Sequence, residues 1–346
     1  MASPPSSVRL QWQGRSAPIG APVGELRSLS EGSRNSLLIE GDNLTALEAL
    51  RTRFKAEVTL AYLDPPFLTG RQHHRITRHR GPAGVVRALR PAFDDRWRSL
   101  DHYLAELDAR LRACRALLAP HGCLVLHVDT KTSHYAKVLC DEIFGSECFA
   151  SEIVWRYRRW PSKTANFQRV HDVLLRYVRD PDAKPRFTQL YEPLAASTQA
   201  TWKSRRQRAV VNAEGRRCRS SKTQEESPGA PLGDVWDISI VAPVAKERTG
   251  YPTQKPRALL DRLIEACTTP GDLVLDPYVG SGTTLAAALD AGRRCIGIDL
   301  NPEALEITTE RLKQMGVVPQ RWQVAQQTTV ESTSSMPTRV LATDTG

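Results

Sequence analysis

The sequence is poor in the features of a membrane protein or a disulfide-stabilised fold. No apolar run is long enough to span a bilayer, and the Met1–Pro5 start lacks the charged and apolar regions of a signal peptide, so we expect a cytoplasmic chain without membrane contact. The seven cysteines include no Cys-x-x-Cys pair and sit mostly in apolar contexts, so we expect neither a disulfide framework nor a metal site. The 346 residues are still enough for a substantial core, in one large domain or two.

Positive charge is abundant and unevenly placed. The formal net charge is +10. Residues 71–98 carry eight Arg against two Asp, and residues 151–224 carry 17 Lys or Arg against six Asp or Glu, so the remainder of the chain is acidic. This segregation favours a contact with a polyanion built onto an ordinary globular body. A solvated arginine-rich surface without a partner is the alternative.

Residues 273–300 form the most informative stretch. They read as an apolar strand, a glycine turn, an alanine-rich helix and a second apolar strand that ends on Asp299. Gly280 and Gly282 let the backbone approach a ligand closely, and the helix that opens at Thr283 presents its positive end there. An acidic residue at the end of the next strand suits the hydroxyls of a ribose. The stretch therefore predicts half of a nucleoside-cofactor site.

The glycine pattern narrows the choice of cofactor. A dinucleotide fingerprint needs a third glycine three residues after the second, and Leu285 occupies that position. Pyrophosphate therefore fits poorly. Asp276 adds a carboxylate near the turn, which suits a cationic ligand such as an amino-acid or sulfonium group. An ordinary strand-helix-strand turn without a ligand is the alternative.

A second motif follows an earlier buried-type strand, residues 58–63. It reads Asp64, Pro65, Pro66 and Phe67, and the two prolines fix a rigid, extended tip at the end of the strand. Asp64 and the carbonyl of Pro65 would offer two acceptors, and Phe67 a flat face. That combination suits a planar ring with an exocyclic amino group. A proline-stiffened loop without function is the alternative.

Other segments are predicted from their periodicity. We expect a short helix capped at residues 41–43, a helix over residues 100–118, and an antiparallel pair formed by residues 153–157 and 173–178. Residues 70–91 show little apolar periodicity and are expected to form a long basic loop beside the site. Thr253 is a candidate cap for the helix that follows it.

Residues 180–250 differ in kind from the rest. They hold basic clusters and isolated aromatic residues, a composition typical of a nucleic-acid surface; a flexible insert is the alternative. The residues that carry this prediction are Arg205, Arg206, Arg208, Arg216, Arg217, Arg219, Trp202 and Trp236.

The sequence combines two motifs in a distinctive order. An Asp-Pro-Pro-Phe tip comes early, and an Asp-Pro-Tyr-Val-Gly-Ser-Gly-Thr-Thr turn comes late, preceded by Thr253-Gln-Lys-Pro. This combination resembles the permuted, beta-type amino DNA methyltransferases of the N6-adenine/N4-cytosine family, including the modification subunits of type III restriction systems. The matching blocks are residues 41–44, 63–70, 127–129, 141–145 and 253–300. The resemblance implies an α/β fold: a Rossmann-like sheet that binds S-adenosylmethionine, with a circularly permuted motif order and an inserted target-recognition region.

The resemblance also implies roles for residues. The S-adenosylmethionine pocket is expected from Asp276, Tyr278, Gly280, Gly282, Thr283 and Asp299, with Asp42 near the adenine of the cofactor and Lys255 on a helix that packs under the cofactor. The catalytic tip is expected from Asp64, Pro65, Pro66 and Phe67. Two positions depart from the usual family pattern. Tyr278 occupies a position where the family usually has Phe, and Phe67 one where it more often has Tyr, so both keep an aromatic ring.

By the same resemblance the chain divides into functional parts. We expect a flexible arm over residues 1–35, the catalytic half over 36–180, target recognition over 181–250, the cofactor half over 251–318 and a disordered tail over 319–346. The predicted partner is double-stranded DNA; a restriction subunit and a second copy of the chain are further candidates.

The predicted reaction is methyl transfer from S-adenosylmethionine to an exocyclic amino group of a flipped base. The first residue of the tip is Asp64 and not a Ser, and this favours N6 of adenine as the methylated atom. N4 of cytosine is the alternative. Two further alternatives are a related enzyme acting on RNA or a protein amide, and a DNA-binding protein or nicotinamide enzyme built on the same turn.

Overall fold

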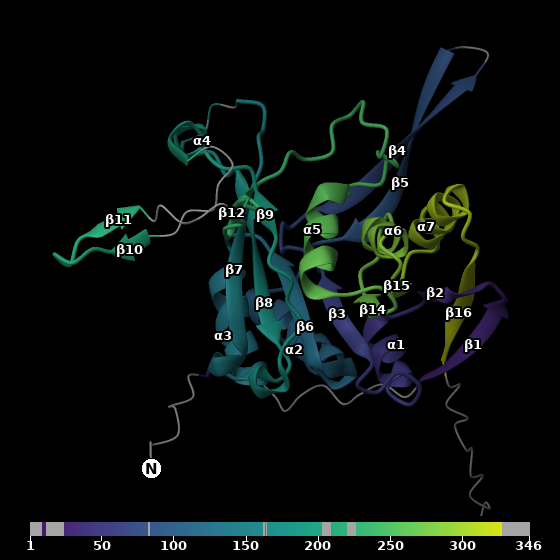
Figure 1. Cartoon of the computed structure of the whole chain (residues 1–346). Helices are drawn as coiled ribbons and strands as arrows, with labels where there is room; N and C mark the ends of the chain where they lie inside the picture. The colour runs from purple at the N-terminus through teal and green to yellow at the C-terminus, as the bar shows by residue number, and fades with distance from the viewer. Residues whose placement is uncertain are drawn as a thin grey trace, which may run out of the picture.

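A ten-stranded sheet runs through the centre of the molecule (Figure 1). The computed structural model describes residues 9–11, 24–81, 84–161, 163, 165–202, 209–219 and 226–326. In spatial order the strands are β1 (Gly24–Ser30), β16 (Pro319–Gln326), β2 (Ser33–Glu40), β15 (Arg294–Asp299), β14 (Leu273–Asp276), β3 (Val58–Leu63), β6 (Leu118–Val128), β8 (His171–Val178), β7 (Phe149–Arg156) and β13 (Val235–Asp237).

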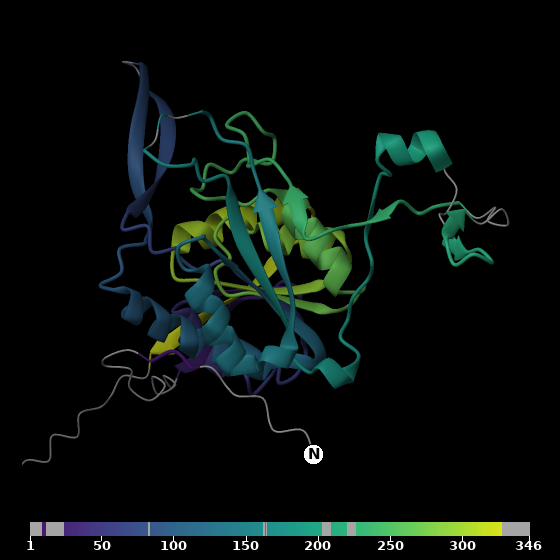
Figure 2. The same ribbon diagram turned by 90° about the vertical axis from the view of Figure 1, so that its left-hand side faces the viewer.

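Two groups of helices cover the faces of this sheet, and Figure 2 shows the sheet between them. In one group α1 (Asn43–Leu50) packs against α2 (Leu100–Leu117), which packs against α3 (Ser133–Phe144). The other is α5 (Arg257–Cys267), α6 (Thr283–Asp290) and α7 (Pro302–Gln314). Because both faces are covered, the central strands are buried on both sides, and every residue of β3 and of β14 is buried.

The order of the central strands brings distant parts of the chain together. Strands β2, β15, β14, β3 and β6 pair in parallel, so the carboxyl ends of β3 and β14 lie at one edge of the sheet. Asp64 follows the first of these strands and Asp276 ends the second. Ligands of open α/β sheets bind at this edge. The predicted Rossmann-like α/β fold is confirmed.

The predicted antiparallel pair is also confirmed. Strand β8 pairs antiparallel with both β6 and β7. Strand β7 therefore runs in the same direction as β6. Its carboxyl end, at Arg156, lies at the edge of the sheet that carries the candidate site.

Residues 70–91 were expected to form a loop, and this prediction is wrong. They belong to a hairpin of β4 (Gln72–Gly81) and β5 (Gly84–Asp94), which projects beyond the body of the molecule in Figure 1. The backbone pairing is continuous from Arg75 opposite Arg90 to Gly81 opposite Gly84. Backbone hydrogen bonds hold such a ladder together without an apolar face, so the hairpin left little periodicity in the sequence.

Both ends of the described chain contribute strands, contrary to the expected arm and tail. Strand β1 and the start of β2 lie within residues 1–35, and β16 lies within residues 319–346. Strand β16 pairs with β1 on one side and with β2 on the other. The strands of the main sheet are therefore drawn from the chain between Gly24 and Gln326.

The segment of residues 180–250 holds only short elements. They are η2 (Pro181–Ala183), β9 (Tyr191–Glu192), α4 (Ala196–Trp202), β10 (Ala209–Val211), β11 (Arg217–Arg219), β12 (Ala230–Pro231) and β13; η1 (Ser146–Cys148) precedes this segment. Strands β10 and β11 form a small hairpin at the periphery (Figure 1), and β12 pairs with β9. Arg205, Arg206 and Arg208 lie outside the described residues, as do the side chains of Trp202, Arg217 and Arg219.

Trp236 does not lie on a nucleic-acid surface, contrary to the sequence prediction. It is only 5% exposed, because β13 pairs with β7 as an edge of the main sheet. Its indole donates a hydrogen bond to the carbonyl of Gly233 at 2.8 Å, and Arg262 lies over its ring. Trp236 is therefore a core residue.

Several smaller predictions can be compared with the structure. Asp42 caps α1, as expected, and Asn301 caps α7. Thr253 caps no helix: α5 begins only after Pro256, and Thr253 has a left-handed φ of 56°. The six cysteines whose side chains are described are free and buried. Within the described ranges no helix is long and apolar enough to cross a membrane, and no cluster of three His, Cys, Asp or Glu could hold a metal.

Candidate active site

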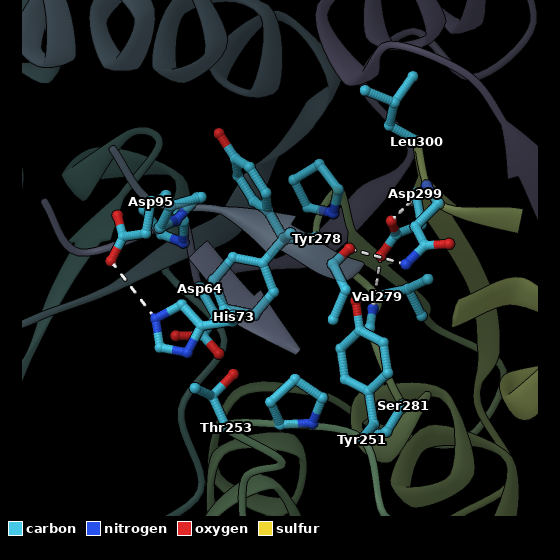
Figure 3. Close-up of a pocket in the computed structure, with 18 of the residues that line it drawn as sticks. Asp64, His73, Asp95, Tyr251, Thr253, Tyr278, Val279, Ser281, Asp299 and Leu300 are labelled. Atoms are coloured by element: carbon cyan, nitrogen blue, oxygen red, sulfur yellow. Dashed lines mark hydrogen bonds and ion pairs between the residues drawn. The ribbon is translucent and has the colours of Figure 1, made fainter. Parts of the chain in front are cut away.

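One cavity of about 450 Å³ lies at the carboxyl edge of the central strands (Figure 3). A volume of this size suits a small-molecule ligand. The predicted site residues that line it are Asp42, Asp64, Pro65, Pro66, Phe67, Lys255, Asp276, Tyr278, Gly280, Thr283 and Asp299. In Figure 3 Asp64 and Asp299 lie on different sides of the cavity, with Tyr278 between them. The two motifs, far apart in the sequence, thus share one cavity.

Gly282 is the one predicted site residue outside this lining, and its role is in packing. It precedes α6 with a φ of +72°, and a Cβ placed there would lie 2.6 Å from the Thr308 side chain of α7. Gly280, at φ +49°, also has a left-handed backbone and does line the cavity. Only glycine adopts both conformations without strain.

Two carboxylates hold the glycine turn from within. Asp299 Oδ2 accepts a hydrogen bond from the backbone amide of Gly280 at 2.9 Å, and its Oδ1 accepts one from the amide of Asn301 at 2.8 Å. Asp276 Oδ1 accepts from the amide of Tyr278 at 2.9 Å. The backbone around the cavity is thereby fixed before any ligand binds.

Burial makes both carboxylates hard to ionise. It raises the pKa of Asp276 to about 7, against hydrogen bonds from Thr284 and Tyr278 that lower it, and the charges of Asp64 and Asp299 raise it further. Burial likewise raises the pKa of Asp299 to about 6. A cationic ligand beside Asp276 would relieve the cost of its charge.

Asp42 is held by a residue that the sequence did not reveal. Arg110 of α2 donates to Asp42 Oδ2 at 3.0 Å and to Asn43 Oδ1 at 2.6 Å, and Asn43 donates to the carbonyl of Pro277 at 3.0 Å. This chain of contacts ties α1 and α2 to the cofactor turn. The periodicity of α2 gave no sign of it, because the partners of Arg110 are distant in the sequence.

The Asp-Pro-Pro-Phe tip, residues 64–67, contains an unsatisfied acceptor. Lys255 Nζ donates a hydrogen bond to Asp64 Oδ2, while Asp64 Oδ1 is buried and finds no hydrogen-bond partner among the described residues. Lys255 also lies 5.1 Å from the centre of the Phe67 ring. Lys255 was expected to support the cofactor, and the structure places it against the catalytic tip. A buried acceptor without a donor is costly, which favours a ligand group that donates there.

A buried chain of polar side chains supports this tip. Tyr62 Oη and His127 Nδ1 are hydrogen-bonded at 2.8 Å, His127 Nε2 lies 3.4 Å from Asp172 Oδ2, and Tyr157 donates to Asp172 Oδ1 at 3.0 Å. Burial, together with the charges of Asp64, Asp276 and Asp172, raises the pKa of Tyr62 well above its usual value, so its hydroxyl stays protonated and donates to His127.

This arrangement fixes the tautomer of His127. Its Nδ1 accepts from Tyr62, and its Nε2 therefore carries the proton that faces Asp172. His127 Nδ1 lies 3.8 Å from Asp64 Oδ1, beyond hydrogen-bonding distance. Asp64 Oδ1 thus stays free for a donor from outside. The block of residues 127–129 gave the only sequence signal for this chain of contacts.

Asp95, at the base of the β4–β5 hairpin, holds the loop that follows the tip. Its carboxylate accepts hydrogen bonds from the amides of Leu68 at 2.8 Å and Thr69 at 3.0 Å, and from the indole of Trp97 at 3.2 Å. Leu68 has a left-handed φ of 59°, a conformation that costs energy for a residue with a side chain. Asp95 therefore fixes a strained loop directly beside Phe67.

A Rossmann-like sheet whose carboxyl edge joins a glycine turn to an Asp-Pro-Pro-Phe tip defines the class of amino-group methyltransferases. The chain matches the family model for DNA methylase, N6_N4_Mtase, over residues 58–310, and it belongs to this family. It is a DNA amino methyltransferase by this membership. The predicted family is confirmed at this level; the likeness to type III modification subunits stays a prediction.

Two relatives align over most of the chain. The type II methyltransferase M.HpaI of Haemophilus parainfluenzae is 29% identical over 267 residues, which cover 77% of this chain and 72% of the relative. The DNA adenine methyltransferase YhdJ of Escherichia coli (strain K12) is 28% identical over 282 residues, covering 81% of this chain and 84% of the relative. The type II methyltransferase M2.DpnII of Streptococcus pneumoniae is 48% identical over 90 residues, or 26% of this chain and 34% of the relative.

Solved structures share the fold. The M1.HpyAVI-SAM complex matches with a TM-score of 0.50 at 19% identity, covering 80% of this chain and 98% of that one. The PvuII DNA methyltransferase (cytosine-N4-specific) matches with a TM-score of 0.53 at 15% identity, covering 82% and 90%. At these identities the likeness shows the architecture alone.

Proposed function

We propose that the protein transfers a methyl group from S-adenosylmethionine to N6 of an adenine in double-stranded DNA, after that base has left the helix. The observation that carries this proposal is the free, buried Asp64 Oδ1, which lines the same cavity as the glycine turn. An amino group would satisfy this acceptor. A cofactor on the turn would lie beside that amino group.

The residues of the turn fit this cofactor. Asp299, at the end of β15, would hold the ribose hydroxyls, and Asp276 would face the cationic part of the molecule, where its charge becomes favourable. Asp42, held by Arg110, would lie near the adenine. When bound, S-adenosylmethionine supplies a methyl group on a positively charged sulfur, open to attack by a nitrogen lone pair.

The residues of the tip would prepare that nitrogen. A base outside the helix costs a few kcal/mol to expose, and stacking on Phe67 would offset part of this cost. Asp64 and the carbonyl of Pro65 would each accept a hydrogen bond from the amino group of the base. These two hydrogen bonds raise the electron density on the nitrogen and orient its lone pair. Lys255 would keep the second oxygen of Asp64 in place.

The choice of adenine over cytosine rests on two supports. The first is the residue at position 64, which is Asp, whereas a Ser there would favour N4 of cytosine. The second is YhdJ, named as a DNA adenine methyltransferase, which is 28% identical over 81% of this chain. N4 of cytosine is the second candidate, since the cytosine-N4-specific PvuII enzyme has the same fold. Sequencing DNA from cells that express the protein, with detection of modified bases, would identify the base and its sequence context.

The division of labour along the chain belongs to the same proposal. Residues 36–180 would carry catalysis, residues 251–318 the cofactor, and residues 181–250 target recognition. The peripheral position of the β10–β11 hairpin, outside the main sheet, supports the last assignment. A restriction subunit and a second copy of the chain stay candidate partners.

The catalytic assignment is tested by Asp64→Ala. Methyl transfer to DNA is expected to fall at least about 100-fold, because a group aimed at the reacting atom is lost, while S-adenosylmethionine binds as before. Transfer of a labelled methyl group and titration calorimetry measure the two properties. Glu57→Ala is the matched control, since Glu57 precedes the opposite end of β3 and its side chain is 45% exposed. Undiminished transfer by Asp64→Ala would remove Asp64 from the mechanism.

A further inference from the structure

The loop of residues 157–170 joins β7 to β8 at the edge of the sheet that carries the active site. Strand β7 runs parallel to β6, so its carboxyl end and the start of β8 lie beside the end of β6. The loop lies outside the region to which target recognition was assigned.

Hydrogen bonds join the base of the loop to residues at the carboxyl end of β6. Tyr157 donates to Asp172, which faces His127, and Arg169 donates to Asp129 Oδ2 at 3.0 Å, directly after β6. Within the loop the side chain of Gln168 donates to the carbonyl of Trp160 at 2.8 Å. The loop therefore has a fixed root, which is linked to Asp64 through Asp172 and His127.

The outer part of the loop exposes two aromatic side chains. Trp160 is 91% exposed and Phe167 is 99% exposed, the two most exposed aromatic side chains in the described part of the chain. Neither packs against the core, so neither is needed for it. Both rings are therefore free to contact a partner.

The charge of the loop identifies the class of partner. Residues 157–170 contain four Lys or Arg and no Asp or Glu. Arg158, Arg159 and Lys163 are exposed. Basic groups interleaved with exposed aromatic rings suit a nucleic acid, in which phosphates pair with the cations and bases stack on the rings. An anionic partner without bases would leave the two aromatic side chains unused.

We propose that this loop binds the DNA duplex beside the target, with Trp160 and Phe167 stacked on bases that become uncovered when the target leaves the helix. The proposal rests on the proposed function and deepens it by assigning a DNA contact outside residues 181–250. Because the root of the loop lies at the same edge of the sheet as Asp64, its aromatic rings are expected beside the part of the duplex from which the target base has left. They are positioning residues, because they would act on the DNA around the target and not on the reacting atoms.

The test compares Trp160→Ala, Phe167→Ala and the double variant with wild type on two duplexes. One is fully paired and carries the methylation site found by sequencing; the other lacks the base opposite the target. On the paired duplex each single variant is expected to lose about 5- to 150-fold in kcat/KM, as stacking of about 1–3 kcal/mol per base predicts. On the second duplex one stacking partner is missing, so the loss is expected to shrink.

Matched variants separate stacking from charge and folding. Trp160→Phe and Phe167→Trp keep a ring and are expected to retain most of the activity. Phe187→Ala removes an exposed aromatic ring near His121, at the opposite edge of the sheet, and should leave kcat/KM within about twofold. Binding of S-adenosylmethionine, measured by calorimetry, should not change in any of these variants.

Two results would overturn the proposal. A double variant with wild-type kcat/KM on the paired duplex would mean that the rings touch no DNA, and an equal loss on both duplexes would rule out stacking on uncovered bases. Fluorescence anisotropy with a random-sequence duplex tests the loop separately from the reaction. If the wild type bound DNA but transferred no methyl group, the proposed function would fail, while weaker DNA binding by the double variant would still support the loop contact.

Discussion

Asp276 is a carboxylic acid whose charge depends on what lies beside it. Because burial raises its pKa to about 7, the side chain without a cation beside it is about half protonated at neutral pH and largely protonated below pH 6. The folded protein therefore holds a proton that the unfolded chain releases near pH 4. Stability from this group is present at low pH and is lost as pH rises from about 4 to about 7. A cation in the site reverses the preference, since it favours the ionised form.

This coupling predicts how cofactor affinity depends on pH. Binding of S-adenosylmethionine should tighten as pH rises toward about 7, by at most about tenfold per pH unit, and then level off. In Asp276→Asn the affinity should be lower at pH 8 and the slope between pH 5.5 and 7 should be reduced. Titration calorimetry across this range measures both. The same slope in the two proteins would show that Asp276 does not face the cation.

The sequence revealed those site residues that stand in local motifs. Asp64, Gly280 and Asp299 were predictable because their chemistry depends on neighbours a few residues away, at the end of a strand or in a tight turn. Arg110 and Asp95 were not, because each acts on a backbone or side chain that is distant in the sequence. Their residue types are common on helix surfaces and in loops, so only the fold shows what they touch.

At the scale of elements, the β4–β5 hairpin connects both halves of the site. Arg75 on β4 donates to Glu303 of α7 at 2.7 Å, and Asn301 donates to the carbonyl of Ala92 on β5 at 2.7 Å. Asp95, just after β5, holds the loop beside Phe67. The base of the hairpin thus contacts the cofactor half and the catalytic tip. The hairpin sequence lacks apolar alternation, as loop sequences do, so it did not reveal these contacts.

The loop contact predicts a variant that loses rate without losing cofactor. In Asp95→Ala the amides of Leu68 and Thr69 lose their acceptor, and the left-handed Leu68 can relax. We expect kcat to fall about 10- to 100-fold, as a displacement of about 1 Å in a reacting group can produce. Single-turnover methyl transfer measures this, with calorimetry for the cofactor.

The control for this variant is Asp101→Ala, which removes an exposed carboxylate from the first turn of α2. It should keep the wild-type rate. A melting curve identifies any general loss of folding in Asp95→Ala. If that variant folded and reacted at the wild-type rate, the held loop would have no part in positioning Phe67.

At the scale of the whole molecule, the sheet depends on strands from both ends of the described chain. Trp322 of β16 packs partly against the core, with the Arg53 guanidinium 4.5 Å above its ring, and Val324 packs there as well. Without β16, strand β1 would lose its only strand partner among the described residues. The sequence suggested an arm and a tail here, because each strand is mostly polar and is stable only when paired.

Removal of β16 should therefore destabilise the entire fold. A chain that ends at Val318 is expected to lose about 3 kcal/mol or more in the free energy of unfolding, since two large side chains lose their cover along with a strand ladder. Urea titration measures the loss. The matched control ends at Gln326 and keeps every described strand. Equal unfolding midpoints for the two chains would show that β16 adds nothing to the body of the sheet.

The pairing of β1 with β16 also bears on the order of the motifs. Gly24 lies directly opposite Gln326, and the two strands are antiparallel, so a turn of two residues would join them into a hairpin. New ends cut within residues 181–250 would then give a chain that begins with the cofactor turn and reaches the catalytic tip last. Every strand of the main sheet would keep its neighbours. The two halves could therefore change places along the chain without any change in the spatial order of the strands in the main sheet.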